Sequence, residues 1–343
     1  KCWDQDPAKR PTFAEITELL KDDKYALREE GPVDFDDLHE YQQRIDSQNI
    51  QSQDNTKTLE AFIRVLKEKK SETVDLVTAT DYDEVDVIGQ GSTSIVKLVV
   101  KNEQYAKKEL QLYDHKSLKR FLKETEILWE LRHPCIVRIF GFDYGNDSTP
   151  PSILLSYEPT TLEAAIKEQK LSNQEKNRIT VEVVLGMRYI HSKNLMHRDL
   201  KPSNILLSKN NHVRITDFGL VKEDWDLDTS FSRGVGTLRC MPPELLSEED
   251  PSSAHYTNKV DVYPFGIMLI YIIDGKYPPF RTSDLFKQAQ PKLPSTPVPW
   301  VSDLISKCLS ISPNDRPSFD EIFNILKAHH FDLFTETYPD KPS

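Results

Sequence analysis

The sequence predicts an α+β protein in which strands come early and helices come late. Residues 88–96 contain a glycine-rich turn between two strand-like runs, and residues 105–108 form a second short strand pattern. Apolar residues recur at helical spacing over 116–132. A continuous apolar run, Ile267 to Ile273, is far too short to span a bilayer, so we interpret it as a buried core helix.

Two short motifs and their spacing carry the functional interpretation. Residues 197–204 have the sequence HRDLKPSN, and residues 217–219 have the sequence DFG. Two short apolar runs, 205–207 and 213–215, separate them. H-R-D-L-x-x-x-N followed by D-F-G is the catalytic signature of the protein kinases. The chain closely resembles that family.

The side chains of these motifs suit phosphoryl transfer. Asp199 can accept the proton of an attacking hydroxyl, while Asn204 and Asp217 offer hard oxygen ligands to Mg²⁺ that bridges the phosphates of ATP. The resemblance places Lys201 on the γ-phosphate. It therefore implies ATP and Mg²⁺ as cofactors and protein side chains as substrates.

Upstream, residues 88–96 resemble the glycine-rich hairpin that closes over phosphates. Gly89 and Gly91 are weak evidence alone, because a tight turn needs glycine anyway. Residues 105–108 resemble the strand that brings Lys108 beneath this hairpin. Glu124 lies in the predicted helix 116–132, and the resemblance implies an ion pair between it and Lys108. Glu126 and Glu130 are the competing acids of that helix.

The family resemblance implies a two-lobed kinase-like fold, with a small β-rich N-lobe, a large α-helical C-lobe and ATP between them. Leu155 would be the gatekeeper, and residues 156–158 the hinge. Val96, Ala106 and Leu206 would flank the adenine. The residues assigned to ATP are Ile88, Gly89, Gly91, Val96, Ala106, Lys108, Leu155, Ser156, Glu158 and Leu206.

The segment after DFG is predicted to seat the substrate and to carry regulation. Residues 236–244, GTLRCMPPE, resemble the substrate segment that ends in A-P-E, and residues 261–266 resemble the start of a long buried helix. In the family, Arg198 receives an activation-loop phosphate, which adds about −1.5 to −2 charges. The alternative is that Arg198 only anchors the catalytic loop. The activation-loop hydroxyls are those of Thr229, Ser230, Ser232 and Thr237.

The two ends of the chain repeat each other. Residues 1–16 align without a gap on residues 307–322, which resemble the closing segment of a kinase domain. In the family, the arginine of this segment pairs with the glutamate of A-P-E, which predicts a buried bond between Arg316 and Glu244. The first copy then resembles the end of an upstream kinase unit in the same polypeptide, of which this chain would be a fragment.

This repeat divides the chain into four expected parts. Residues 1–20 are the remnant of the upstream unit, 21–80 a linker, 81–330 the kinase domain and 331–343 a C-terminal tail. Most of the linker is charged or polar and cannot bury a core. Residues 58–69 carry an amphipathic stripe, which predicts either a linker helix against the upper lobe or a docking helix for a partner.

In the family, Lys201 and Thr237 are typical of serine and threonine acceptors, and the closing segment at residues 1–13 is typical of tyrosine-kinase-like members, so the resemblance implies a tyrosine-kinase-like serine/threonine kinase. Pro242 and Pro264 replace the usual alanine and serine, and Cys240 stands where an aromatic residue is common, but no catalytic group is missing. The alternative is a pseudokinase that uses the fold to bind nucleotide or to act as a scaffold.

Composition agrees with an intracellular signalling enzyme. The 343 residues carry a net charge of −11, which argues against nucleic acid or an anionic membrane as the main partner. The four cysteines show no C-x-x-C pairing, which fits a reducing cytosol and predicts a cytoplasmic protein. No transmembrane run or signal peptide is visible, although the chain begins at Lys1 without a methionine.

Overall fold

The structure is a computed structural model. It describes residues 75–76, 82–91, 93–111, 115–143, 150–219, 239–245, 257–279, 291–294 and 298–334. The predicted upstream remnant and the amphipathic stripe at 58–69 lie outside these residues, and so does most of the predicted linker. The chain divides into two compact units. Among the described residues, the first unit comprises those between Asp75 and Trp129 together with Phe140–Leu155, and the second comprises Glu130–Ile139 and those between Ser156 and Phe334.

The first unit is built on a six-stranded sheet with the order β1-β5-β6-β4-β3-β2. Strands β2 to β4 form an antiparallel meander, and the short β1 pairs in parallel with β5. The predicted hairpin is confirmed, because the N–H of Gly91 donates to the carbonyl oxygen of Ser94 over 2.8 Å between β2 and β3. The strands are β1 (Asp75–Leu76), β2 (Asp83–Gln90), β3 (Ser94–Val100), β4 (Gln104–Leu110), β5 (Ile139–Asp143) and β6 (Ser152–Ser156).

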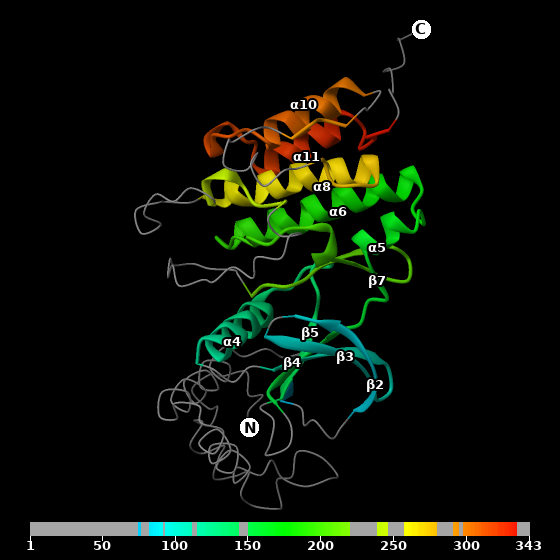
Figure 1. The fold of residues 1–343 in the computed structure, drawn as a ribbon, viewed down its shortest axis with the longest axis vertical. Coiled ribbons are helices and arrows are strands. Elements are labelled where there is room, and N and C mark those ends of the chain that lie inside the picture. The colour runs from blue at the N-terminus through cyan, green and yellow to red at the C-terminus, as the bar shows by residue number, and fades with distance from the viewer. Residues whose placement is uncertain are drawn as a thin grey trace, which may run out of the picture. The chain divides into compact units, whose positions relative to one another are not determined.

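Helix α4 (His115–Glu130) runs beside this sheet (Figure 1). It confirms the helix predicted over 116–132, and the apolar residues at helical spacing are its buried face. The helix ends at Glu130, two residues before the predicted limit.

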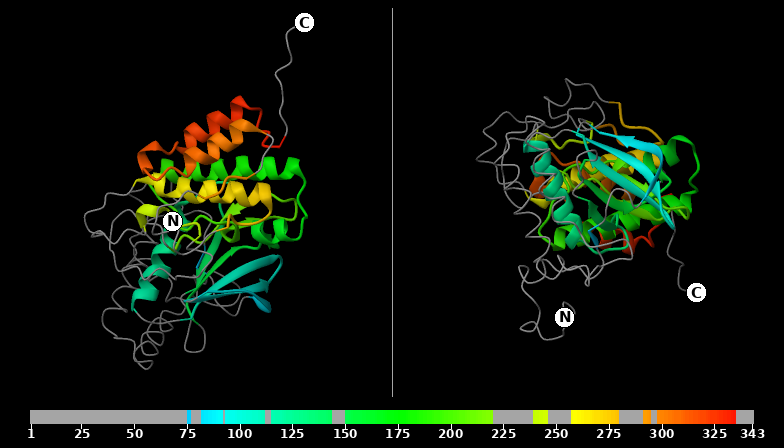
Figure 2. Two further views of the ribbon diagram at one scale, coloured as in Figure 1. Left: turned by 45° about the horizontal axis from the view of Figure 1, so that its top comes forward. Right: turned by 90° about the horizontal axis from the view of Figure 1, so that it is seen from below.

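The second unit is mostly helical. Its sheet has the order β7-β8-β9, and its helices α6, α8, α10 and α11 lie alongside one another in layers (Figures 1 and 2). The strands are β7 (Thr160–Thr161), β8 (Ile205–Leu207) and β9 (Val213–Ile215). The α-helices are α5 (Leu162–Lys167), α6 (Asn173–Ser192), α8 (Val262–Asp274), α10 (Pro299–Cys308) and α11 (Phe319–Ala328), and the 3₁₀ turns are η4 (Pro202–Asn204), η5 (Pro243–Leu245), η7 (Asn258–Asp261) and η8 (Pro313–Asp315).

Helix α8 is the core helix that the late apolar run predicts, since nearly all of its residues are buried. It ends at Gly275, which adopts a left-handed conformation with φ of 71° and returns its N–H to the carbonyl oxygen of Tyr271. No helix within the described residues is long and apolar enough to cross a membrane.

The buried bond predicted between Arg316 and Glu244 is confirmed. The guanidinium Nη1 and Nη2 atoms lie 2.6 and 2.7 Å from the two carboxylate oxygens, and Arg316 is 1% exposed. Three backbone carbonyls, those of Lys259, Ser310 and Ile311, accept the remaining guanidinium bonds. Because a buried charge is costly unless it is fully paired, this set of acceptors is what allows an arginine in the core.

The packed unit extends into the residues that follow α11. Leu333 is 1% exposed, and its N–H donates to Asn177 Oδ1 on α6 over 3.0 Å. Asn177 Nδ2 in turn donates to Asp332. Residues 331–334, which the sequence assigns to the tail, therefore pack against α6.

We expect Gly266→Ala to destabilise the protein. A Cβ at this position would lie 2.9 Å from the Cβ of Cys308 and 3.0 Å from Leu309 Cδ2, so α8 would be forced away from the end of α10. Such overpacking costs about 1–3 kcal/mol. Chemical denaturation measures it. Gly89→Ala is the control, since its Cβ would meet Val96 at an ordinary 3.5 Å; equal losses in both variants would contradict this account.

Candidate active site

The catalytic loop brings three predicted residues together around one carboxylate. Asp199 Oδ2 accepts a hydrogen bond from Lys201 Nζ at 2.6 Å and one from Asn204 Nδ2 at 2.9 Å. The same amide nitrogen of Asn204 donates to the Asp199 carbonyl oxygen at 2.8 Å. The turn η4 produces this arrangement, because Pro202 begins it and Asn204 ends it. Two side-chain donors thereby hold one oxygen of the Asp199 carboxylate.

Burial raises the pKa of the Asp199 carboxyl above its ordinary value. Lys201 opposes this rise through its charge and hydrogen bond, whereas the negative charge of Asp217 adds to it. A carboxylate whose pKa is raised in this way accepts a proton more readily than an exposed one.

Asp217 follows β9 and is connected to Asn204 through the backbone. The N–H of Thr216, the preceding residue, donates to the Asn204 carbonyl oxygen over 3.0 Å. Asp217 and Arg198 both have positive φ, 67° and 63°, which is uncommon outside glycine. Such conformations persist only where the surrounding contacts enforce them, and they concentrate at functional sites.

Sequence reasoning missed the residue that anchors this loop, Asp261. Its side chain is completely buried at the start of α8. Oδ1 accepts the N–H of Arg198 at 2.7 Å, and Oδ2 accepts the N–H of His197 at 2.9 Å. His191 Nε2 lies 2.8 Å from the same Oδ2. The available signal was a charged residue directly before an apolar helix, which is costly unless it has buried partners.

The pKa of Asp261 is nevertheless lowered. Burial opposes the ionised form, but the hydrogen bond and charge of His191, with further help from His197 and the Arg198 N–H, outweigh it. The imidazole of His197 continues the network, since its Nε2 lies 3.0 Å from the Thr216 carbonyl oxygen. The loop that carries Asp199 and the segment that carries Asp217 are therefore held by one set of bonds.

In the first unit, the predicted ion pair between Lys108 and Glu124 is confirmed. Lys108 Nζ lies 2.6 and 2.7 Å from the two carboxylate oxygens, and Glu124 is buried. Of the competing acids, Glu126 pairs with Lys123, and Glu130 is exposed. The strand β4 and the helix α4 thus fix the lysine ammonium group in position.

The predicted ATP-binding residues fall in both units. In the first unit, Val96 on β3 lies opposite Lys108 on β4. Ala106 lies on β4 two residues before Lys108, so all three side chains share one face of the sheet. Gly89 pairs with Val96, with Ile88 before it and Gly91 beyond the end of β2. Leu155 is buried in β6.

In the second unit, Leu206 on β8 lies opposite Arg214 on β9. The N–H of Ser156 donates a hydrogen bond to the Arg138 carbonyl oxygen over 2.8 Å. The Glu158 side chain faces away from solvent, and its Oε1 lies 3.5 Å from Arg214 Nε. Burial raises the pKa of Glu158, while Arg214 and a hydrogen bond with Ser156 lower it in part. The predicted hinge is thereby attached to β9.

The predicted activation-loop residues, Thr229, Ser230, Ser232 and Thr237, lie outside the described part of the chain. Their regulatory phosphorylation stays a prediction. Cys240, which follows them, is described and buried. Burial, with a contribution from the charge of Asp199, raises its pKa to about 12, so its thiol stays protonated and unreactive at neutral pH.

Residues 82–327 match the family model of the protein kinase domain. The chain belongs to the protein kinase family. The match covers strands β2 to β6 and α4, and it extends through most of α11 in the second unit.

The kinase domain is similar to several curated proteins. A probable serine/threonine-protein kinase of Dictyostelium discoideum is 30% identical over 277 residues, 73% of this chain and 20% of the relative. The dual specificity protein kinase pyk3 of the same organism is 29% identical over 342 residues, 96% of this chain and 24% of the relative. Aurora kinase C of Mus musculus is 32% identical over 211 residues, 58% of this chain and 72% of the relative.

The chain spans only part of several of these relatives. Its matches cover from a fifth to about half of the first three Dictyostelium kinases, at 20%, 27% and 49% of their lengths.

We expect Asp261→Asn to destabilise the kinase domain strongly. An asparagine has one oxygen and one NH₂ group, so its NH₂ would face the backbone N–H of either His197 or Arg198. One buried hydrogen bond to a charged acceptor is then lost, and two donors point at each other. The expected cost is on the order of 3 kcal/mol. Urea unfolding at pH 7 measures it.

Asp320→Asn is the matched control for this substitution. Its carboxylate is 72% exposed and pairs with Arg188 at the surface, so the expected loss is below about 1 kcal/mol. If the two variants lost the same stability, Asp261 would not be the anchor that its contacts indicate.

Proposed function

We propose that this protein kinase transfers the γ-phosphoryl group of ATP to serine and threonine hydroxyls of protein substrates. The observation that carries this proposal is the arrangement around Asp199, whose carboxylate is held by Lys201 at 2.6 Å and by Asn204 at 2.9 Å. Phosphoryl transfer needs positioned charges more than covalent chemistry, and this loop supplies them.

Asp199 acts as the group that orients the acceptor hydroxyl and takes its proton. Its raised pKa favours proton acceptance, and the charge and hydrogen bond of Lys201 favour the ionised carboxylate. The same ammonium group of Lys201 is proposed to bind the γ-phosphate. A cation between base and phosphate also offsets charge that develops during transfer.

The side chains of Asn204 and Asp217 suit Mg²⁺. Carboxylate and amide oxygens are the hard ligands that this ion prefers. The Asn204 amide nitrogen is turned toward Asp199, which leaves the amide oxygen for a ligand, and the Thr216 N–H bond keeps the Asp217 segment beside Asn204. A bound Mg²⁺ would neutralise phosphate charge there.

We propose that Lys108, paired with Glu124, contacts the phosphates of ATP. An ammonium held by a buried carboxylate is fixed in position, so it can contact the phosphates without losing side-chain freedom on binding. Ile88, Gly89, Gly91, Val96, Ala106 and Leu155 are proposed to contact the nucleotide from the first unit. Ser156, Glu158 and Leu206 are proposed to contact it from the second unit.

Serine and threonine are the proposed acceptors because Lys201 follows Asp199 by two residues and Thr237 lies in the substrate segment. Relatives are named serine/threonine-protein kinases, and one is named a dual specificity protein kinase. The tyrosine-kinase-like subclass is part of this proposal. A pseudokinase is not favoured, because every side chain that the chemistry needs is present.

We further propose that residues 1–20 derive from an upstream kinase unit and that the kinase acts in the cytoplasm. The gapless alignment of residues 1–16 on 307–322 supports the first statement, and the dispersed cysteines support the second.

Asp199→Asn and Asp217→Ala should both abolish phosphoryl transfer, for different reasons. Asp199→Asn removes the proton acceptor, so turnover falls by about 10²–10⁴-fold while Mg²⁺-ATP binding is retained. Asp217→Ala removes a metal ligand, so Mg²⁺-dependent nucleotide binding weakens as well. Calorimetric binding and phosphate transfer to a generic protein acceptor separate the two.

Asp303→Asn, an exposed position on α10, controls for nonspecific effects of removing a carboxylate. If Asp217→Ala bound Mg²⁺-ATP as tightly as the parent and kept its turnover, the metal assignment would be wrong.

Turnover should fall on the acid side at a higher pH than an ordinary aspartate would give. Asp199 must be ionised to accept a proton, and burial raises its pKa above 3.8, so the active form is present above that raised pKa and is lost as pH falls through it. Rates at saturating ATP between pH 4 and pH 8 test this, with circular dichroism to confirm folding. A rate that stayed constant down to pH 4 would remove Asp199 from the role of base.

A further inference from the structure

Strand β9 is an edge strand, and its outer backbone groups need partners. Val213 and Ile215 direct their N–H groups away from β8. At Ile215, residues 135–137 supply the partners, since the Ile215 N–H donates to the Cys135 carbonyl oxygen at 2.8 Å and the Val137 N–H donates to the Ile215 carbonyl oxygen at 2.9 Å. At Val213 no strand lies alongside among the described residues, and a side chain takes its place.

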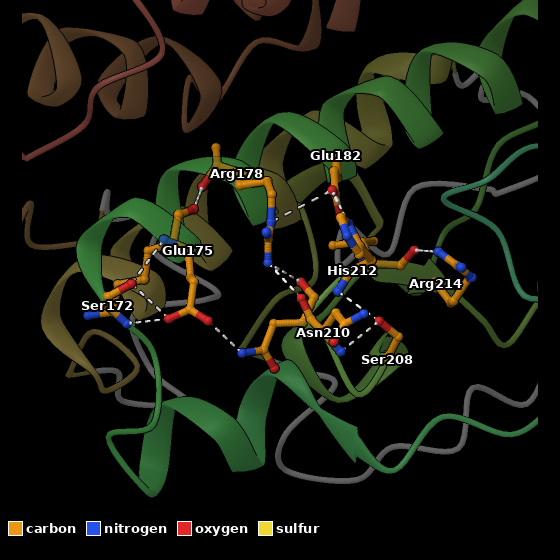
Figure 3. Close-up of polar contacts among 12 residues, drawn as sticks. Ser172, Glu175, Arg178, Glu182, Ser208, Asn210, His212 and Arg214 are labelled. Carbon is orange, nitrogen blue, oxygen red and sulfur yellow. Dashed lines mark hydrogen bonds and ion pairs between the residues drawn. The ribbon is translucent and has the colours of Figure 1, made fainter.

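That side chain belongs to Glu182 on α6. Glu182 Oε2 accepts the Val213 N–H at 2.8 Å, and Oε1 lies 2.7 Å from His212 Nδ1 (Figure 3). Arg178, one turn earlier, approaches the same Oε1 at 3.9 Å and donates from Nη2 to the Asn210 carbonyl oxygen at 2.8 Å. The carboxylate therefore has both oxygens engaged, and its side chain is 16% exposed.

The same face of α6 touches β9 again one turn later. Gly186 has no side chain at a point where a Cβ would lie 2.6 Å from Ile215 Cδ1. Helix α6 therefore approaches β9 closely at Ile215 and bonds to its backbone at Val213. Two contacts on one strand fix both its position and its direction.

This strand leads directly to the candidate metal ligands. Asp217 comes two residues after β9, and Asn204 comes directly before β8, so the β8–β9 hairpin has one candidate ligand at each end. A shift of β9 relative to β8 would move Asp217 relative to Asn204, because each strand carries one of the two residues and the Thr216 to Asn204 hydrogen bond links those ends.

We propose that Glu182 is a positioning residue for this pair. Its carboxylate replaces a neighbouring strand at the edge of β9 and thereby holds the segment of Asp217 beside Asn204, where the two side chains could hold Mg²⁺. This inference rests on the proposed function, because it assigns Glu182 a role in the metal dependence of the same site.

Glu175 provides a matched control on the same helix. It is also a glutamate that contacts the hairpin, since its Oε1 accepts Asn211 Nδ2 at 2.7 Å. That bond is to a side chain at the turn and not to the backbone of β9. Glu175 also closes the capping box with Ser172, and these bonds lower its pKa to about 2. Its loss should destabilise α6 without releasing β9.

The experiment compares Glu182→Leu, Glu182→Gln and Glu175→Leu with the parent protein. Two readouts are independent of turnover: backbone hydrogen exchange of peptides covering 212–217 without nucleotide, and the Mg²⁺ concentration for half-maximal ATP binding. Glu182→Leu should speed the exchange and raise the Mg²⁺ requirement by about tenfold or more. Glu182→Gln should keep the exchange rate and the Mg²⁺ requirement close to those of the parent, because its amide oxygen still accepts the Val213 N–H. Glu175→Leu should lower the melting temperature and leave both unchanged.

Several results would overturn the proposal. They are parent-like exchange and Mg²⁺ requirement in Glu182→Leu, equal changes in Glu175→Leu, or a failure of Glu182→Gln to rescue. If Glu182→Leu does not fold, Glu182→Asp replaces it. The shorter carboxylate of Glu182→Asp should raise the Mg²⁺ requirement, whereas Glu182→Gln should not. A raised Mg²⁺ requirement in Glu182→Gln but not in Glu182→Asp would refute the proposal.

Failure of the proposed function would look different. A parent protein without Mg²⁺-dependent ATP binding or phosphoryl transfer would reject that function and, with it, the metal role of Glu182. A parent that binds and transfers while Glu182→Leu behaves identically would reject only the role of Glu182.

Discussion

Asp261 places a negative charge where water does not reach, at the start of the most apolar helix in the described part of the chain. Three donors, the N–H groups of His197 and Arg198 and the ring of His191, compensate for the lost hydration. Because two of these donors are backbone groups of the catalytic loop, the loop cannot move without exposing an unpaired charge. Arg198 keeps its positive φ under this constraint.

The remaining elements of the site are fixed by the same principle, a charged group whose partners lie on another element. Glu182 attaches β9 to α6, Arg316 attaches Glu244 to the closing segment, and Lys108 attaches β4 to α4. Each charge would be costly if its partner were displaced. The groups proposed for transfer, Asp199 and Asp217, are thus held by contacts that do not include the substrate, which is how preorganised sites lower a reaction barrier.

The sequence motifs predicted side chains that the structure brings together, but they missed the residues that support them. Asp199, Asn204 and Lys108 lie in short motifs whose spacing is set by local turns and strands, so their positions follow from neighbouring residues. Asp261 and Glu182 were missed because each accepts hydrogen bonds from backbone N–H groups far along the chain, at Arg198 and Val213. Any residue has a backbone N–H, so these contacts leave no pattern of residue types. The anchors emerge only when the helices are packed.

The most direct test of the account is the identity of the phosphorylated residue. Parent protein would be incubated with Mg²⁺, ATP labelled at the γ-phosphate and a degenerate peptide library of serine, threonine and tyrosine acceptors, with mass spectrometry of the products. The account predicts label on serine and threonine and little on tyrosine. The account would be contradicted if the protein bound nucleotide tightly but labelled no peptide. This result would have to hold both for untreated protein and for protein first phosphorylated by another kinase.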